Sequence, residues 1–403
     1  MKNYRLSLVR LIFIMGMVLL FRSIIYVDNQ TKTHTFQRTS NLPEVDRGIA
    51  VIETKTGDIV AIGVIKKDPQ ANGDILLVCS EATGNVKWTR TFGGEGDDMG
   101  WDLIEIPIGG FLLAGTSNSH NQGSRDIIVI KTDSMGKEVW KKTYGTEREE
   151  YCWDMAVTQD GNVLLAGETS IEGPYGKGNK DFYAVKIDLQ GNLIWSQTYG
   201  GNKTDRCYAV DSTPDGFVLL GSTNSYGAGD QDVYLIKINP QGREQWSKTF
   251  GSEKFDMGHD VKRTHDGGYI IIGYSQTQSQ GKNDSWIIKI DSKGNKLWES
   301  LIGEKEDDRT VRGIQTKDGN YVMTGYTKSY GASIWDLLLI KIDKQGKVTW
   351  RRNHSGISAD LGYGIFESKD GGILLAGQTY SYGNHRGDLW LLKTDVHGKI
   401  SKE

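Results

Sequence analysis

The sequence contains little proline and cysteine, and it has no surplus of charge of either sign. Only six of its 403 residues are proline although 51 are glycine, so we expect the glycines to form tight turns and not a disordered linker. Its three cysteines are too few and too scattered for a disulfide framework or a zinc site. A net charge of −3 supplies no field that would attract DNA or RNA. A disulfide scaffold and a nucleic-acid partner are therefore not expected.

Linear catalytic signatures are absent as well. No Gly-x-Ser-x-Gly, His-Glu-x-x-His, phosphate-binding or dinucleotide-binding motif stands where local structure would support it. A binding protein is therefore the first hypothesis, and an enzyme that assembles its site from distant residues is the alternative.

The first 28 residues differ from the rest of the chain. Lys2, Arg5 and Arg10 precede an uninterrupted apolar run at residues 11–21, which is typical of an export signal. No small-residue cleavage site follows, so an uncleaved membrane anchor with its basic end in the cytoplasm stays open as an alternative. In both cases we expect the remaining chain to be extracytoplasmic, either secreted or attached to the membrane through this segment alone.

The rest of the chain repeats one unit, seen most clearly at residues 284–298. An apolar run, a Lys-x-Asp exit, a Gly turn and a Trp follow one another there. The Gly of the preceding strand recurs every 52 residues, and once after 54, at Gly63, Gly115, Gly167, Gly221, Gly273, Gly325 and Gly377. The Trp recurs with it at Trp88, Trp140, Trp195, Trp246, Trp298 and Trp350. Seven units are therefore present.

Each unit contains four short runs that are typical of β-strands. In the fifth unit they cover residues 258–264, 268–274, 285–290 and 297–302, each rich in Ile, Val and Tyr and bounded by Gly, Asn or Asp. Tight Gly turns favour antiparallel hairpins. Residues 29–403 are thus predicted to be all-β, a seven-bladed β-propeller of four-stranded antiparallel blades. The expected blades are roughly 45–93, 94–145, 146–200, 201–251, 252–303, 304–356 and 357–403.

The two ends of the chain predict how the ring closes. The last unit has Lys402 in the Trp position, so it lacks its outer strand. Upstream, Thr35 and Phe36 match the Thr-Phe pair at 91–92 that ends another outer strand. We therefore expect residues 32–38 to supply the fourth strand of the last blade, which would remove a raw sheet edge.

Several motifs together resemble a known family. A Gly-Gly-x-x-x-Asp start, a Gly-x-Thr-x-Ser strand and an Asp-to-Lys-x-Asp hairpin occur at Gly93, Gly94, Asp98, Gly115, Thr116, Asp126, Lys131, Asp133 and Gly136. This set is similar to the bacterial and archaeal seven-bladed propeller repeats abbreviated SBBP, over residues 45–400. The resemblance implies an exported or surface protein and assigns little chemistry. The Trp hairpin also looks distantly like quinoprotein repeats, but the seven units and the lack of vicinal cysteines depart from the quinone enzymes, so no quinone is expected.

One face of the predicted ring gathers the long loops, because the connections between blades and the second-to-third loops emerge on the same side. These loops carry many carboxylates, together with four tyrosines among Gly, Ser and Asn: Tyr175, Tyr226, Tyr330 and Tyr382. Aromatic rings with short polar neighbours suit recognition of a protein or glycan. The alternative is that each tyrosine packs over its own loop.

An acid opens every blade, at Asp46, Asp98, Glu150, Asp205, Asp256, Asp308 and Asp360. Because it recurs in all seven units, we expect it to cap a turn. Positions where the blades differ carry more functional information, since a structural requirement would apply equally to all blades.

Two such positions follow the opening acid on the innermost strands. Four residues after it stand Asp102, Asp154, Asp260 and Arg312, which we expect to converge at the channel mouth. One residue earlier stands a predicted aromatic collar of Trp101, Trp153, Tyr208, His259 and Tyr363. Converging carboxylates suit a hard cation such as Ca²⁺ or an acid–base pair. Alternatively, they bond the backbone amides of neighbouring blades.

The sequence thus supports two functional hypotheses. The first is an exported or membrane-anchored binding module that presents its loop face, through Trp101, Trp153 and the four loop tyrosines, to a protein or glycan. It needs no cofactor beyond a Ca²⁺ ion that Asp102, Asp154 and Asp260 could hold. The second is a polysaccharide lyase or hydrolase with an acidic site at the channel mouth, formed by Asp102, Asp154, Asp260, His259 and Arg312.

Overall fold

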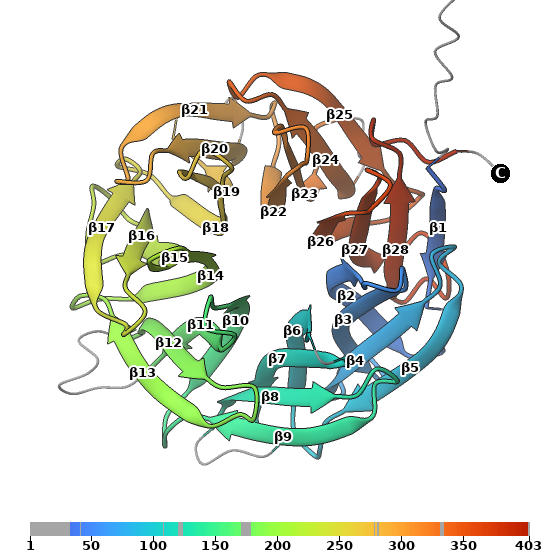
Figure 1. The fold of residues 1–403 in the computed structure, drawn as a ribbon. Coiled ribbons are helices and arrows are strands. Elements are labelled where there is room, and N and C mark those ends of the chain that lie inside the picture. Colours follow the sequence, from blue (N-terminus) through green and yellow to red (C-terminus); the bar gives the residue numbers. More distant parts are fainter. Residues whose placement is uncertain are drawn as a thin grey trace, which may run out of the picture. The chain divides into compact units, whose positions relative to one another are not determined.

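The computed structural model describes residues 33–40, 42–107, 109–119, 124–170, 179–277, 279, 282–330 and 334–401. Every regular element in these ranges is a strand, and the strands form four-stranded sheets arranged in a ring (Figure 1). The predicted signal or anchor, residues 1–28, lies outside the described residues. Within the described ranges no helix has the length and apolar character needed to cross a membrane.

Each sheet runs from an innermost strand to an outermost strand. In that order the first four blades contain β2 (Val45–Glu53), β3 (Ile59–Lys66), β4 (Gly73–Ser80) and β5 (Val86–Phe92); β6 (Asp98–Glu105), β7 (Phe111–Ser117), β8 (Asp126–Thr132) and β9 (Glu138–Tyr144); β10 (Glu150–Val157), β11 (Val163–Thr169), β12 (Asp181–Ile187) and β13 (Leu193–Tyr199); β14 (Asp205–Thr213), β15 (Gly216–Thr223), β16 (Asp232–Ile238) and β17 (Glu244–Phe250). The last three contain β18 (Asp256–Arg263), β19 (Tyr269–Ser275), β20 (Asp284–Ile290) and β21 (Lys296–Ile302); β22 (Asp308–Gln315), β23 (Tyr321–Thr327), β24 (Asp336–Ile342) and β25 (Val348–His354); β26 (Asp360–Glu367), β27 (Ile373–Thr379), β28 (Asp388–Thr394) and β1 (Phe36–Thr39).

The predicted architecture is confirmed, including the way in which the ring closes. Seven sheets of four antiparallel strands are present, and the N-terminal strand β1 pairs antiparallel with β28 as the fourth strand of the last blade. β1 is shorter than the predicted strand at 32–38, and it ends one residue later. The start of the chain therefore completes the blade that the end of the chain leaves unfinished.

The sequence match that pointed to β1 is wrong in register. It places Phe36 at the end of an outer strand, whereas Phe36 pairs with Lys393 in the same way that Trp140 pairs with Lys131. Phe36 therefore takes the Trp position, at the start of the strand. Ser40 takes the position expected for Phe36, and its N–H donates to the carbonyl of Leu389 at 3.1 Å.

The side chain at the Trp position explains this register. Each Trp ring lies against the glycine in the third-to-fourth turn of the next blade, as Trp88 lies against Gly136. Gly136 has a φ of 74°, and a Cβ there would run into the Trp88 ring. Phe36 lies against Gly84 in the same way. The aromatic contact thus passes from blade to blade and also crosses the seam between the two chain ends.

The glycine with the 52-residue spacing makes room for a β-bulge in the innermost strand. Gly115 pairs with Gly100, after which the register skips Trp101 and resumes at Asp102. A Cβ on Gly115 would collide with the carbonyl oxygen of Met99. All seven innermost strands shift register at this point. Because a bulge re-aims the extra side chain, the predicted collar consists of bulged residues.

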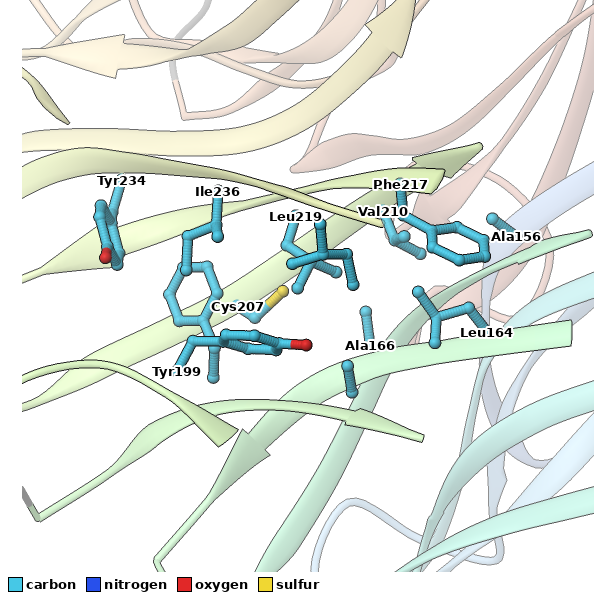
Figure 2. Packing of buried hydrophobic residues seen from close by; sticks show 13 residues of the cluster. Ala156, Leu164, Ala166, Tyr199, Cys207, Val210, Phe217, Leu219, Tyr234 and Ile236 are labelled. Carbon is cyan, nitrogen blue, oxygen red and sulfur yellow. The ribbon is translucent and has the colours of Figure 1, made fainter. Parts of the chain in front are cut away.

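Hydrophobic clusters between neighbouring sheets hold the ring together. The second and third strands are buried along most of their length, and β7 is buried throughout, which explains their continuous apolar runs. Figure 2 shows the cluster between the third and fourth blades, where Phe217 and Leu219 of β15 face Leu164 and Ala166 of β11. Each such side chain contributes about 1.5–3 kcal/mol when fully buried. The three cysteines are also buried, and none of them forms a disulfide.

In six of the seven blades the opening acid caps a turn, as predicted. Asp98 accepts a hydrogen bond from the N–H of Gly94 at 2.9 Å and another from the hydroxyl of Ser119 at 2.5 Å. The equivalent acids accept an N–H bond from the residue four positions earlier at Glu150, Asp205, Asp256, Asp308 and Asp360. These carboxylates are buried, so they stabilise the connections between blades and are not part of an exposed acidic surface.

Two carboxylates of the first blade fasten the seam instead. Asp46 Oδ1 accepts hydrogen bonds from the Ser40 hydroxyl and the Leu389 N–H, both at 2.7 Å. At the other end of the same strand, Glu53 Oε2 accepts the N–H of Lys369 at 2.8 Å. The first and last blades are thus joined by side-chain bonds as well as by β1.

Candidate functional site

The collar forms a nearly continuous run of rings at the loop-face end of the innermost strands. The centroids of Trp101 and Trp153 lie 4.4 Å apart, those of Trp153 and Tyr208 6.1 Å, and those of Tyr208 and His259 5.5 Å. Tyr363, the fifth predicted member, contacts a tyrosine of the preceding blade instead. Four successive blades therefore share one aromatic surface, which the bulges bring together.

The histidine in this run is neutral at physiological pH. Burial lowers the pKa of His259 to about 4, and the positive charges of Arg312 and Arg309 act in the same direction. His259 therefore contributes a flat polar ring to the collar and not a cation.

A second row of side chains borders the collar, one residue after each opening acid. We call it the mouth row, and it consists of Arg47, Met99, Tyr151, Arg206, Met257, Arg309 and Leu361. The Arg47 guanidinium lies 5.8 Å from the centroid of Trp101, and that of Arg309 lies 4.9 Å from the centroid of Tyr274. The Arg206 side chain is 45% exposed. The mouth row thus contains both cationic and apolar side chains.

The centre of the loop face is less acidic than the sequence suggests. Asp97 is paired with Arg125, with 3.5 Å between Oδ2 and Nη2, and Asp307 is paired with Arg309, with 3.0 Å between Oδ1 and Nη2. Among the described residues Arg47 has no carboxylate partner. An arginine thus lies beside each of these two carboxylates.

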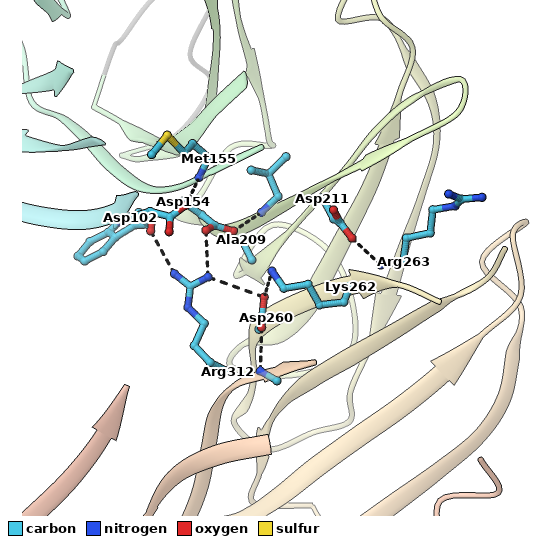
Figure 3. A network of polar contacts seen from close by, with 12 residues as sticks. Asp102, Asp154, Met155, Ala209, Asp211, Asp260, Lys262, Arg263 and Arg312 are labelled. Carbon is cyan, nitrogen blue, oxygen red and sulfur yellow. Dashed lines mark hydrogen bonds and ion pairs between the residues drawn. The ribbon is translucent and has the colours of Figure 1, made fainter. Parts of the chain in front are cut away.

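Arg312 crosses the ring on the innermost strands (Figure 3). It belongs to β22 of the sixth blade, and its Nη1 lies 2.9 Å from Oδ1 of Asp154 in β10 of the third blade. The same nitrogen is 3.9 Å from Oδ1 of Asp260, which also pairs with Lys262 at 3.0 Å. The predicted convergence of these residues is therefore present, and a buried ion-pair network spans the axis.

The aspartates of this network also join neighbouring blades. Asp102 accepts the N–H of Met155 at 3.2 Å. Asp154 and Asp260 accept the N–H groups of Val210 and Gly313, each at 2.9 Å. Bonding to the backbone of the next blade is one of the alternatives that the sequence leaves open, and the geometry supports it.

Two of the carboxylates have opposite protonation behaviour. Burial and the nearby charge of Asp154 raise the pKa of Asp102 to about 8, so it holds a proton at neutral pH. Burial alone would also raise the pKa of Asp154, but Arg312 and Lys262 hold it below its usual value. Asp154 is therefore the ionised partner of Arg312, and Asp102 is neutral beside it.

These residues do not fit a metal ion as they are arranged. In the described part of the chain no group of three or more His, Cys, Asp or Glu side chains is placed to hold a metal. The Arg312 guanidinium already supplies the positive charge for Asp154 and Asp260. Binding of Ca²⁺ by Asp102, Asp154 and Asp260 thus gains no support from the geometry.

The predicted loop tyrosines lie on separate loops. The hydroxyls of Tyr226 and Tyr382 each donate to a carbonyl in the connection that opens their own blade, at 2.9 and 2.8 Å. The Tyr330 ring lies under the guanidinium of Arg351, 3.2 Å from its centroid. Tyr175 lies outside the described residues. The three described tyrosines therefore pack over their own blades, as the alternative interpretation predicts, and the contacts found for them do not join them to the collar.

Sequence reasoning missed the mouth row, although a signal for it exists. The comparison of blades that singles out Asp102 and Trp101 works equally well one residue after the opening acid. There the seven blades carry three arginines, two methionines, a tyrosine and a leucine. This variation marks a position that the fold does not dictate.

Comparison with known proteins supports the fold. No protein-family model matches the chain. Regulatory protein FlaEY of Caulobacter vibrioides is 24% identical over 175 residues, a match that covers 38% of this chain and only 18% of FlaEY. The WD40 domain of Neurospora crassa Pan2 superimposes with a TM-score of 0.57 at 10% identity, covering 92% of this chain and 98% of that domain. Chaetomium thermophilum Sqt1, solved bound to the N-terminus of ribosomal protein L10, has a TM-score of 0.51 at 12% identity, covering 87% and 97%.

The fold and the comparisons together define a class. The chain is a seven-bladed β-propeller. At these identities the structural likeness extends to the fold and not to the ligand.

Proposed function

We propose that the chain is a protein-binding module that presents the collar and the mouth row to a protein ligand. The observation that carries the proposal is the mixture of Arg, Met, Tyr and Trp side chains around the axis at one face of the ring. These residue types are enriched in the cores of protein interfaces, and Trp, Tyr and Arg supply most hot spots. Sqt1, a structural neighbour, is also a propeller that binds a segment of another protein.

The ring contacts favour a protein over a glycan. A sugar stacks on the free face of an aromatic ring, but Trp153 lies parallel to Tyr151, with 5.8 Å between centroids and 4° between planes. Tyr151 in turn carries the ammonium of Lys180 at 4.5 Å from its centroid. Because these rings already have neighbours on their faces, a ligand can reach only their edges and the side chains beside them. Such contacts suit peptide groups.

A random-peptide display library tests the proposal. The full chain, purified in a mild detergent, should enrich particular peptides, and a variant with Trp101→Ala and Tyr208→Ala should lose them because both rings are half-buried parts of the collar. Tyr226→Ala, a loop tyrosine away from the collar, is the matched control and should retain them. Absence of enrichment by folded wild type, or equal enrichment by the collar variant, would overturn the proposal.

We also propose that the chain acts outside the cytoplasm, as an SBBP-like repeat protein. The support is the basic and then apolar start of the sequence together with the similarity of its repeats to that family. Fusion of the chain to a reporter enzyme that is active only after export is the test. An inactive reporter on a full-length fusion would contradict the proposal, and mass spectrometry of the mature protein would show whether residues 1–28 are removed.

A polysaccharide lyase or hydrolase is the second candidate, and one observation favours it. Asp102 holds a proton at neutral pH while Asp154 is ionised, which is the division of roles that general acid–base catalysis requires. Asp102 is the half-exposed member of the pair. Polysaccharide breakdown by wild type that Asp102→Asn abolishes would support this candidate, whereas equal activity in both proteins, or none in either, rejects it.

A further inference from the structure

Two carboxylates beside the mouth row each serve two cations. Glu168 is buried and serves two cations, Lys180 and Arg206, with 3.6 Å between its Oε2 and the Arg206 Nε. Asp97 likewise serves both Lys66 and Arg125. Each of these two clusters therefore has a positive surplus, although the whole chain has a net charge of −3.

One more cation at the mouth adds to the surplus. Arg47 lies over Trp101, and within the part of the chain that the structure describes no carboxylate pairs with it. The seven innermost strands surround the axis (Figure 1), and the arginines of the mouth row belong to three of them, in the first, fourth and sixth blades. A ligand that meets them would have to carry several negative charges.

Aromatic rings hold these guanidinium groups in place. Arg309, whose Nη2 is also paired with Asp307, lies 4.9 Å from the centroid of Tyr274 and 5.8 Å from that of Trp335. A guanidinium that lies on a ring keeps N–H donors at its edge, where a carboxylate can accept them in bidentate fashion. Prior fixation by the ring lowers the entropy lost when a ligand binds. The arrangement is thus suited to carboxylate recognition.

Apolar side chains fill the places between these cations. Met99 follows Arg47 around the ring and is partly exposed, whereas Met257, between Arg206 and Arg309, is buried. Methionine adapts its shape to varied apolar partners and is common at surfaces that bind peptides. An anionic polysaccharide would match the charges but offers no apolar side chains for these positions. A peptide that mixes acidic and apolar residues matches both.

We infer that the protein ligand binds through an acidic segment, a stretch of chain with Asp or Glu interspersed among apolar residues, held by Arg47, Arg206 and Arg309 with Met99 beside Arg47. This inference rests on the proposed function. Arg clusters that read acidic motifs are a recurring mode of peptide recognition. Glu168 is a positioning residue in this arrangement, because it orients Arg206 and Lys180 without facing the ligand.

The display library separates this inference from the proposed function. If the peptides lost with the collar variant are rich in Asp and Glu, both statements stand. If such peptides are recovered without acidic enrichment, the chain is a protein-binding module of another specificity and the inference of an acidic segment fails alone.

Direct binding to a defined probe tests the arginines. A fluorescein-labelled peptide of alternating Glu and Leu is titrated with the full chain, and anisotropy is recorded. Wild type should bind it, Arg47→Met and Arg309→Met should each weaken binding about tenfold, and binding should weaken steadily as salt rises. Arg90→Met is the matched control, because Arg90 also lies over a tryptophan, 5.2 Å from the centroid of Trp88, but on the outermost strand β5.

Several outcomes would overturn the inference. They are equal binding of a Gln-Leu peptide, an equal effect of Arg90→Met, and no binding of the Glu-Leu probe by folded wild type. Binding of oligogalacturonate in preference to the peptide would also overturn it, since that result would assign the surface to an anionic glycan. Circular dichroism of each variant shows whether a loss of binding is a loss of fold. Glu168→Gln should weaken binding of the probe less than Arg206→Met does.

Discussion

Replacement of Arg312 by methionine tests the ion-pair network that crosses the ring. Met preserves most of the length and the apolar stem of the side chain but removes the charge. Asp154 and Asp260 are 4% and 0% exposed, and Arg312 is 19% exposed. Removal of one partner from a buried pair leaves an uncompensated charge, which typically costs about 3–5 kcal/mol. Lys262 stays 3.0 Å from Asp260, so we expect the lower end of that range, about 3 kcal/mol.

The loss should depend on pH in a definite direction. In wild type the pKa of Asp154 is below its usual value, so its stabilising contribution is present above the unfolded-state pKa and is lost as pH falls through the folded-state pKa. Without Arg312, burial should raise that pKa above the unfolded-state value. The variant then loses stability as pH rises through the window between the two. The difference between wild type and variant should therefore widen as pH rises above about 4.

Urea unfolding followed by tryptophan fluorescence measures the free energy of unfolding at each pH. Arg312→Met combined with Asp154→Asn should recover stability, because Asn keeps an oxygen for the N–H of Val210 and carries no charge. Arg351→Met is the matched control, since Arg351 is half-exposed on β25 and its pair with Glu304 should contribute less than about 1 kcal/mol. A loss below about 0.5 kcal/mol for Arg312→Met, or a difference that is constant with pH, would refute the reasoning.

Three further predictions concern the seam and the core. Burial raises the pKa of Asp46 to about 7, so the seam should lose stability as pH rises from about 4 to about 7. Asp46→Asn should therefore raise the urea midpoint of unfolding at about pH 8. A lower midpoint for this variant would contradict the prediction. Phe36→Ala should lower the free energy of unfolding by about 3 kcal/mol or more, because the ring is 2% exposed and packs on Gly84. Phe36→Trp introduces the residue that the other blades use at this position, so it should cost much less. Equal losses for the two variants would contradict the assigned register. The three buried thiols should resist a thiol reagent until the chain is unfolded, and rapid labelling of the native protein would show that the inter-blade clusters open.

The fold was accessible from sequence because the repeat encodes it redundantly. Gly115 and its equivalents must lack a Cβ to admit the bulge, and each Trp needs a turn glycine on the next blade. The glycine recurs seven times and the Trp six times at a spacing close to 52 residues, so the number of blades can be counted. The predicted strands of the fifth blade end within two residues of the observed ones.

Other features depend on contacts that the repeat does not encode. Phe36 was matched to the wrong end of an outer strand because a Thr-Phe pair carries no information on which side chain packs against Gly84. The partner of Arg312 lies 158 residues away, across the ring and not on a neighbouring blade. The residues that converge on the axis could be named from sequence, but the pairing of Arg312 with Asp154 follows only from the arrangement of the blades.

The central claim is that ligand binding takes place at the mouth row, and site-specific photocrosslinking tests it most directly. A photoreactive benzoylphenylalanine replaces Met99 in the mouth row or, in a second protein, Leu193, which is 56% exposed on the outer strand β13. Each protein is irradiated with the peptides that the display library enriches. We predict covalent adducts at position 99 and none at position 193. Adducts at position 193 without any at position 99 would contradict the account.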